Sequence, residues 1–192
     1  IESVTIPEGV TTIGEEAFFE CQSLASINIP NTVTTIGESA FGVCYGLKSL
    51  AIPDSVTTIG YGAFQSCKNL TSVTIGSGLT EISTWMFAGC SSLTDIVIPE
   101  SVSAIGARAF GSCSSLTRVD CLPTTPPTIG SEIFYDVSAD CKIYVPDGTY
   151  DTYVTADGWV EYKDMIVNPN PTPAVQSQIL YTSTDGAIVT PY

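Results

Sequence analysis

Seven cysteines are the first residues in this sequence whose chemistry has to be explained. Five of them stand 23 residues apart, at Cys21, Cys44, Cys67, Cys90 and Cys113, and Cys121 and Cys141 follow. Evenly spaced thiols could serve metal binding, disulfide formation or nucleophilic catalysis. Each of these uses requires particular residue types near the cysteines or a particular cysteine spacing, and both can be checked in the sequence.

The spacing supports none of the three uses. A structural zinc site takes close ligand pairs such as Cys-x-x-Cys, and the chain has none. The chain also lacks histidine, which is the commonest metal ligand and the usual base beside a nucleophilic cysteine. No calcium-binding loop spacing is present either. The sequence therefore predicts a protein that is not an enzyme and holds no metal and no cofactor.

A cluster of carboxylates near the C-terminus gives the one remaining route to hydrolysis. Its members are Asp147, Asp151, Asp157, Glu161 and Asp164. Paired acids hydrolyse glycosides only when a cleft holds two of them at a fixed separation. In a chain with a formal net charge of -14, chance clustering is the interpretation we favour. A component of a glycan-processing enzyme is kept as a remote alternative.

The charge balance also limits the partners. Six Lys and Arg residues stand against 20 Asp and Glu, whereas nucleic acid and anionic membranes require a basic face. No run of 18 apolar residues exists, so we expect no direct membrane insertion. We interpret the acidity as solubility outside a cell or at its edge. No signal peptide is visible, and the first residues already belong to a repeat, so we expect any export signal to lie upstream or to have been removed.

The cysteine spacing is one part of a repeat that includes the whole N-terminal region. Phenylalanines at 18, 41, 64, 87 and 110 and leucines at 24, 47, 70, 93 and 116 follow the same step. The unit is L-x-x-I-x-I-P-x-x-V-T-x-I-G-x-x-A-F-x-x-C-x-x, and a sixth, irregular copy contains the extra residue Leu122. One copy cannot bury its own apolar side chains, so we expect the copies to stack and cover one another.

Each copy predicts three short segments. The alternating Leu-x-x-Ile-x-Ile indicates a strand, which a proline ends because proline cannot donate to a ladder. Val-Thr-Thr-Ile indicates a second extended piece, and the glycine after it marks a corner. Ala-Phe-x-x-Cys predicts one helical turn with Phe and Cys on the same face. We therefore predict an α/β solenoid, a right-handed superhelix with short parallel strands, short helical turns and a C-terminal cap.

This stacking also assigns a role to the cysteines. In neighbouring coils their Cβ vectors run side by side, which is poor disulfide geometry, so we interpret the five regular ones as small buried hydrophobes. Cys121 and Cys141 stand apart from that column, about one coil from each other. A bridge between these two stays open.

Three phrases carry a resemblance to a known family. IPEGVTTIGEEAFFEC, IPNTVTTIGESAFGVC and IPDSVTTIGYGAFQSC resemble the leucine-rich repeats of BspA-like surface proteins of anaerobic bacteria. The resemblance covers roughly residues 1–146 and departs from the broader leucine-rich consensus in lacking its interior asparagine ladder. It implies a curved solenoid that is secreted or displayed on a bacterial cell surface, acts through binding, and is closed by a terminal segment.

The remaining sequence divides into three parts. Residues 147–167 hold a dense set of aromatic and apolar side chains, which we interpret as a cap over the last coil, with Thr149 capping a short helix that runs through Ala156. A sugar-binding platform is the alternative for these aromatics. Residues 168–175 form a Pro-rich linker, and residues 176–192 indicate a hairpin that starts a further module or pairs as a tail.

Two surfaces are candidates for binding. The outward side of the strand sheet is the usual binding surface of a curved solenoid, and its candidate residues are Ser72, Thr74, Asp95, Val97, Arg118 and Asp120. Tyr61 and Trp85 form a candidate aromatic patch on the side of the helical turns, with partial burial as the alternative. Because the strand face is small and polar, we expect a broad, weak contact there.

These observations favour an extracellular or cell-surface binding protein that mediates protein–protein contact or adhesion to host or matrix proteins. The alternative is a structural spacer that presents another domain. Carbohydrate is a further partner for which the sequence gives no support.

Overall fold

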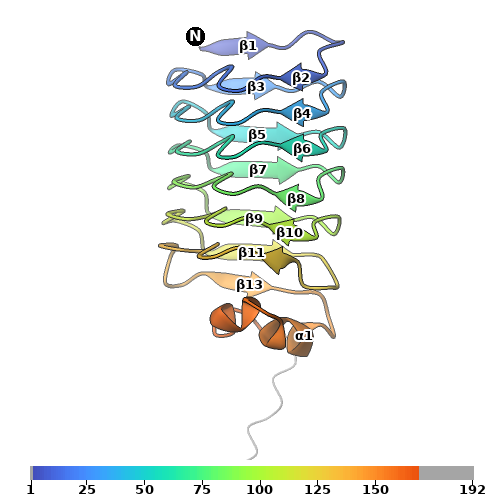
Figure 1. The fold of residues 1–192 in the computed structure, drawn as a ribbon. Helices are drawn as coiled ribbons and strands as arrows, with labels where there is room; N and C mark the ends of the chain where they lie inside the picture. The colour runs from blue at the N-terminus through green and yellow to red at the C-terminus, as the bar shows by residue number, and fades with distance from the viewer. Residues whose placement is uncertain (1, 169–192) are drawn as a thin grey trace, which may run out of the picture.

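The computed structural model describes residues 2–168, and within them the chain forms a solenoid of stacked coils (Figure 1). Each of the first six coils contributes one longer strand and one two-residue strand, the last longer strand is followed by a helix, and all strand pairs are parallel. The predicted parallel-strand solenoid is confirmed, while the right-handed sense of the superhelix stays a prediction.

The strands form two rows along the stack. The longer row contains β1 (Ser3–Thr5), β3 (Ser26–Asn28), β5 (Ser49–Ile52), β7 (Ser72–Ile75), β9 (Asp95–Ile98), β11 (Arg118–Cys121) and β13 (Lys142–Tyr144). The short row contains β2 (Thr12–Ile13), β4 (Thr35–Ile36), β6 (Thr58–Ile59), β8 (Glu81–Ile82), β10 (Ala104–Ile105) and β12 (Thr128–Ile129). The repeat sets the register, because Ser49 pairs with Ser72 and Asp95 with Arg118. Beyond the extra residue Leu122, Arg118 pairs with Lys142.

The third side of each coil differs from the prediction. The helical turn expected at Ala-Phe-x-x-Cys is a run of consecutive β-turns instead, as when Ala17 N–H donates to Gly14 O and Cys21 N–H to Phe18 O. Between these turns, Phe18 N–H donates 2.8 Å to Ala40 O of the next coil. In a helical turn, the Phe18 N–H would donate its hydrogen bond to a carbonyl of its own coil. The bonds between coils therefore replace the helix.

Side-chain hydroxyls add a second set of bonds between coils. The hydroxyls of Thr32, Ser55 and Ser101 donate to backbone carbonyls of the preceding coil, at 2.7–2.8 Å. The asparagine ladder of the broader leucine-rich consensus is lacking at these positions, where Thr32, Ser55 and Ser101 bond one coil back instead.

Four of the corner glycines leave no room for a side chain. A Cβ added at Gly37, Gly60, Gly106 or Gly130 would lie only 2.3–2.5 Å from a backbone nitrogen of the preceding coil. At Gly14, nothing lies within 4 Å of such a Cβ. Close approach of successive coils therefore requires glycine at these four corners, whereas Ser83 occupies the same position in the fourth coil and its hydroxyl donates 2.8 Å to Gly60 O.

The core is a column in which each side chain packs on its counterparts one coil away. The rings of Phe18, Phe41, Phe64, Phe87, Phe110 and Phe134 stack at centroid distances of 5.1–5.9 Å, with interplanar angles of 15° or less. Each buried side chain of this size contributes about 1.5–3 kcal/mol of transfer free energy. This column holds the coils in register. It therefore also fixes which side chains of neighbouring coils lie beside one another on the outer surfaces.

The C-terminal end of the stack carries α1 (Tyr150–Thr155) and the 3₁₀ turn η1 (Trp159–Tyr162) (Figure 1). Tyr153 and Trp159 are fully buried there, and their polar atoms donate 2.7 Å hydrogen bonds to Pro123 O and Pro127 O of the irregular coil. Tyr162 closes the phenylalanine column with an edge-on contact to Phe134. Because Tyr153 and Trp159 are buried, neither ring can act in the alternative sugar-binding platform.

The start of α1 agrees only in part with the prediction. Thr149 precedes the helix as predicted, but it makes no side-chain cap; its hydroxyl donates to Pro146 O instead. The cap assigned to residues 147–167 stays a prediction about what the segment does. The hairpin and, apart from Asn168, the linker lie outside the described residues.

The corner glycines give the first prediction. Gly60→Ala should destabilise the fold by about 1–3 kcal/mol, because its Cβ would meet the backbone of Glu38 at 2.4 Å. Gly14→Ala is the matched control and should change stability little. Urea unfolding followed by circular dichroism measures both. Equal midpoints for the two variants would contradict the close packing of coils.

The buried aromatics of the C-terminal segment give the second prediction. Trp159→Ala should lower the free energy of unfolding by about 3–5 kcal/mol, because it opens a cavity and leaves the carbonyl of Pro127 without its donor. Val160, whose side chain is 49% exposed, provides the control Val160→Ala. The urea midpoint of Trp159→Ala shows whether residues 147–167 stabilise the end of the stack or contribute nothing to its stability. An unchanged midpoint for Trp159→Ala would rule out the covering role.

Candidate functional site

The strand face is the outward side of the longer strands, and its candidate residues lie on three neighbouring strands. Ser72 and Thr74 are on β7, Asp95 and Val97 on β9, and Arg118 and Asp120 on β11. The parallel register sets Arg118 beside Asp95, and Asp120 beside Val97. All six are exposed except Asp120, which is half-buried. The structure thus brings the predicted residues together on one surface.

Strand β13 extends this surface with two residues that the sequence analysis missed. Lys142 pairs with Arg118, and Tyr144 pairs with Asp120. The guanidinium of Arg118 lies over the Tyr144 ring, 4.0 Å from its centroid, and donates two 2.7 Å hydrogen bonds to the Asp120 carboxylate. These bonds to Asp120 raise the pKa of Arg118 above its usual value. Since Ile143 points inward, the alternation already placed Tyr144 outward.

The turn side carries a second surface, built around the predicted patch. The rings of Tyr61 and Trp85 stack at a centroid distance of 6.2 Å. The Arg108 guanidinium lies 5.7 Å from the Trp85 ring and 5.0 Å from the Tyr135 ring. Its Nε donates 2.6 Å to Glu132, which pairs with it ionically. Arg108 and Tyr135 were missed, although Arg108 stands one 23-residue step after Trp85.

The backbone explains why these side chains project outward. Each coil has two left-handed positions on the turn side, and the first of them holds Gly62 (φ 56°), Trp85 (61°), Arg108 (51°) and Glu132 (56°) in successive coils. A left-handed backbone costs an L-residue about 1–2 kcal/mol, which the bonds between coils must outweigh. Glycine at position 62 is free of that cost. The column therefore accepts different side chains without change to the core.

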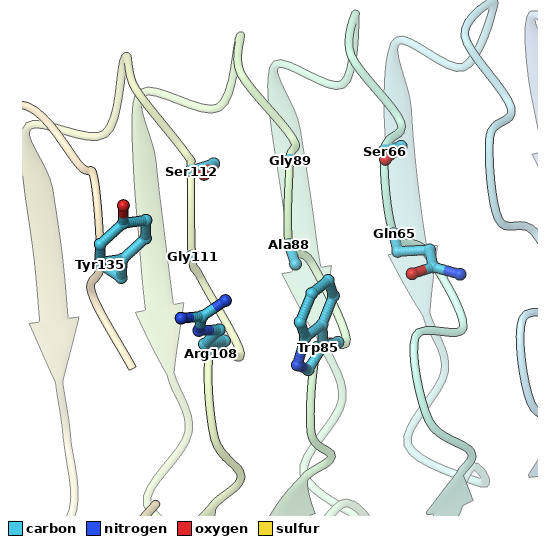
Figure 2. Close-up of a pocket in the computed structure, with 9 residues that line it drawn as sticks. All are labelled: Gln65, Ser66, Trp85, Ala88, Gly89, Arg108, Gly111, Ser112 and Tyr135. Atoms are coloured by element: carbon cyan, nitrogen blue, oxygen red, sulfur yellow. The ribbon is translucent and has the colours of Figure 1, made fainter. Parts of the chain in front are cut away.

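A hollow of about 280 Å³ lies beside this column, and we call it the turn-side trough (Figure 2). Its lining residues are Gln65, Ser66, Trp85, Ala88, Gly89, Arg108, Gly111, Ser112 and Tyr135. Figure 2 shows Trp85 and Arg108 along one side, Ser66, Gly89 and Ser112 along the other, and Ala88 and Gly111 between them. The trough exists because the residues along its middle are small.

The cysteines form a hydrogen-bonded ladder inside the solenoid. All seven are free, and the thiols of Cys44, Cys67, Cys90 and Cys113 donate to a phenylalanine carbonyl of the preceding coil at 3.1–3.3 Å. Burial raises the pKa of Cys44 and Cys113 to about 12 and that of Cys121 and Cys141 to about 11. The bridge left open between Cys121 and Cys141 is absent. Cys121 Sγ instead lies 3.4 Å from the Tyr153 hydroxyl.

The acidic cluster near the C-terminus is exposed at every position, from Asp147 to Asp164. Across residues 2–168, no group of three or more His, Cys, Asp and Glu side chains could hold a metal ion. Over the same residues, no helix combines the length and apolar character needed to cross a bilayer.

Comparison with known proteins gives a family match over most of the chain. A model described as the BspA type leucine rich repeat region matches in six copies, over residues 1–117 and 81–153. A search among curated proteins gave no match.

Solved structures of bacterial leucine-rich repeat proteins share the fold. A leucine-rich repeat protein from Eubacterium ventriosum is 28% identical with a TM-score of 0.63, over 71% of this chain and 43% of its own. The T. pallidum leucine rich repeat protein is 30% identical with a TM-score of 0.51, over 76% and 59%. A leucine rich cell surface protein from Faecalibacterium prausnitzii is 23% identical with a TM-score of 0.49, over 82% and 64%. The chain thus spans less than half of the E. ventriosum structure.

The thiol ladder yields a prediction about reactivity. Thiols with raised pKa values stay protonated at pH 8, so iodoacetamide should leave Cys44, Cys113, Cys121 and Cys141 unmodified in the folded protein. The half-buried Cys21 is removed by Cys21→Ser to simplify the readout. Intact-mass measurement after unfolding without reductant should then show every remaining cysteine labelled. Incomplete labelling of the unfolded chain would reveal a disulfide.

Proposed function

The chain belongs to the BspA-type leucine-rich repeat family, and from this premise we propose that it is an exported binding module that contacts another protein through its strand face. Proteins of this repeat architecture are compatible with protein–protein interaction. We place the contact at the C-terminal part of the face, on β9, β11 and β13. The partner we propose is a host or matrix protein, bound by adhesion at the surface of the cell.

The observation that carries this proposal is the grouping of Val97, Arg118 and Tyr144. Tyr and Arg are the residue types most often found at the energetic centres of protein interfaces. The side chain of Val97 is 44% exposed and that of Tyr144 is 36% exposed. A bound partner would therefore bury apolar surface on both. Arg118 is held in place by Asp120 and Tyr144, so little side-chain entropy is lost when a partner covers it.

Charge also favours this part of the face. Asp95 and Asp120 stand among Arg118 and Lys142, so the two signs nearly balance there, within a protein whose formal net charge is -14. An acidic partner would be repelled by much of the molecule but not by this patch. The mixture of charges supports a specific protein contact over non-specific attraction.

The location that we propose is outside the cell or on its surface. The family resemblance supports it, since the repeats resemble those of bacterial surface proteins. The seven cysteines do not oppose it, because burial and raised pKa values protect most of them from an oxidising environment.

A structural spacer is the second candidate function. It is favoured by the outward residues of the first coils, which are small or polar, such as Ser3, Thr5, Ser26 and Asn28. A regular stack with this surface would hold a neighbouring domain at a fixed distance without binding anything itself.

Binding and spacing make different predictions. If the strand face binds a matrix protein, purified laminin and collagens are suitable probes. At least one of them should bind saturably when passed over the immobilised protein. Tyr144→Ala and Arg118→Glu should each weaken that binding about tenfold or more, because each removes a held contact at the centre of the patch. Surface plasmon resonance measures both effects.

Lys48→Glu provides the matched control, since Lys48 is an exposed cation on an earlier coil of the same side. It should leave binding unchanged. Absence of binding to the whole panel, or equal losses in all three variants, would contradict the proposed strand-face contact. In that case, restoration of the cellular phenotype by an unrelated rod of the same length would support the spacer.

A further inference from the structure

The turn-side trough is a concave surface that the proposed strand-face contact does not use. It follows one repeat position through four coils, which hold Gln65, Ala88, Gly111 and Tyr135 in turn. The two small residues leave the middle open, while Gln65 and Tyr135 stand at its two ends (Figure 2). With about 280 Å³, the trough is just below the roughly 300–1,000 Å³ that is usual for small-molecule sites. It suits a small or narrow ligand better than a folded protein surface.

Main-chain groups along the trough are already hydrogen-bonded to neighbouring coils. Ser66 N–H donates to Ala88 O, Gly89 N–H to Gly111 O, and Ser112 N–H to Tyr135 O. An extended peptide gains affinity on a protein edge mainly by pairing its backbone with free main-chain groups. The trough offers no such row, so recognition there falls to side chains.

The side chains of the trough combine aromatic walls with fixed polar groups. The Arg108 guanidinium is held between the Trp85 and Tyr135 rings and by Glu132. The Gln65 amide is oriented by its donation to Ser39 Oγ at 3.3 Å, which leaves its oxygen as an acceptor. Hydroxyls of Ser66 and Ser112 line the opposite side. Donors, acceptors and ring surfaces are therefore arranged around one narrow hollow before any ligand arrives.

The charge of the site argues for a ligand without net charge. Glu132 neutralises Arg108, and the protein as a whole carries a formal net charge of -14, which repels anions. A cationic ligand would compete with Arg108 for the same ring faces. A neutral molecule rich in hydroxyls, with apolar C–H faces, satisfies both the polar groups and the rings.

We propose that the turn-side trough binds a neutral oligosaccharide. Sugar C–H groups pack against Trp85 and Tyr135, and the ring hydroxyls exchange hydrogen bonds with Arg108, Gln65 and the two serines. This site is separate from the strand face and does not depend on the protein contact proposed above.

The test is an array of neutral and acidic glycans, followed by titration of each hit, with chitotriose, cellotriose and mannotriose included as neutral probes. The decisive variant is Ala88→Gln, which fills the middle of the trough with the residue that the preceding coil carries at the same repeat position, Gln65. Trp85→Gly removes one wall and adopts the residue that the preceding coil carries as Gly62, with a left-handed backbone that glycine accepts. Both should weaken neutral-glycan binding at least tenfold in isothermal titration calorimetry.

Controls separate this site from the strand face and from loss of the fold. Arg118→Glu should leave glycan binding unchanged, and Ala88→Gln should leave protein binding unchanged. Thermal unfolding followed by circular dichroism verifies that each variant is folded. No binding to any neutral glycan, selective binding of acidic glycans, or undiminished binding in folded Ala88→Gln would each overturn the proposal.

Discussion

The contact of each coil with the next is the interaction on which the whole structure depends. No coil has a core of its own: the phenylalanine column, the hydroxyl bonds and the thiol bonds all reach from one coil to its neighbour. The corner glycines permit the approach, because a Cβ at Gly60 would already be too close to Glu38. Stability is therefore a sum over neighbouring pairs, and each lateral surface is fixed by the same spacing.

The repeat was sufficient to predict the strands, the buried columns and the stacking from the sequence. It was not sufficient for the third side. Phe18 and Cys21 are three residues apart both in a helical turn and in two successive β-turns, so side-chain spacing does not distinguish them. The difference lies in where Phe18 N–H donates, which is to Ala40 in another coil. Only the arrangement of coils in space reveals that choice.

Only part of each candidate surface could be predicted from the sequence, because the prediction relied on the spacing of the repeat. Ser72, Asp95 and Arg118 could be placed on one face because they share one repeat position. Tyr144 required the alternation of the last strand to be followed past the irregular coil. Tyr135 was harder to find, because the extra residue Leu122 moves it 24 positions from Gly111 instead of 23.

The left-handed positions on the turn side separate the outer surface of the solenoid from its core. Because Gly62, Trp85, Arg108 and Glu132 occupy equivalent sites without disturbing what lies beneath, mutation can alter this exterior while the scaffold persists. Such an arrangement lets the outer side chains of this side differ from coil to coil on a constant framework. It also makes this side a natural starting point for engineered libraries.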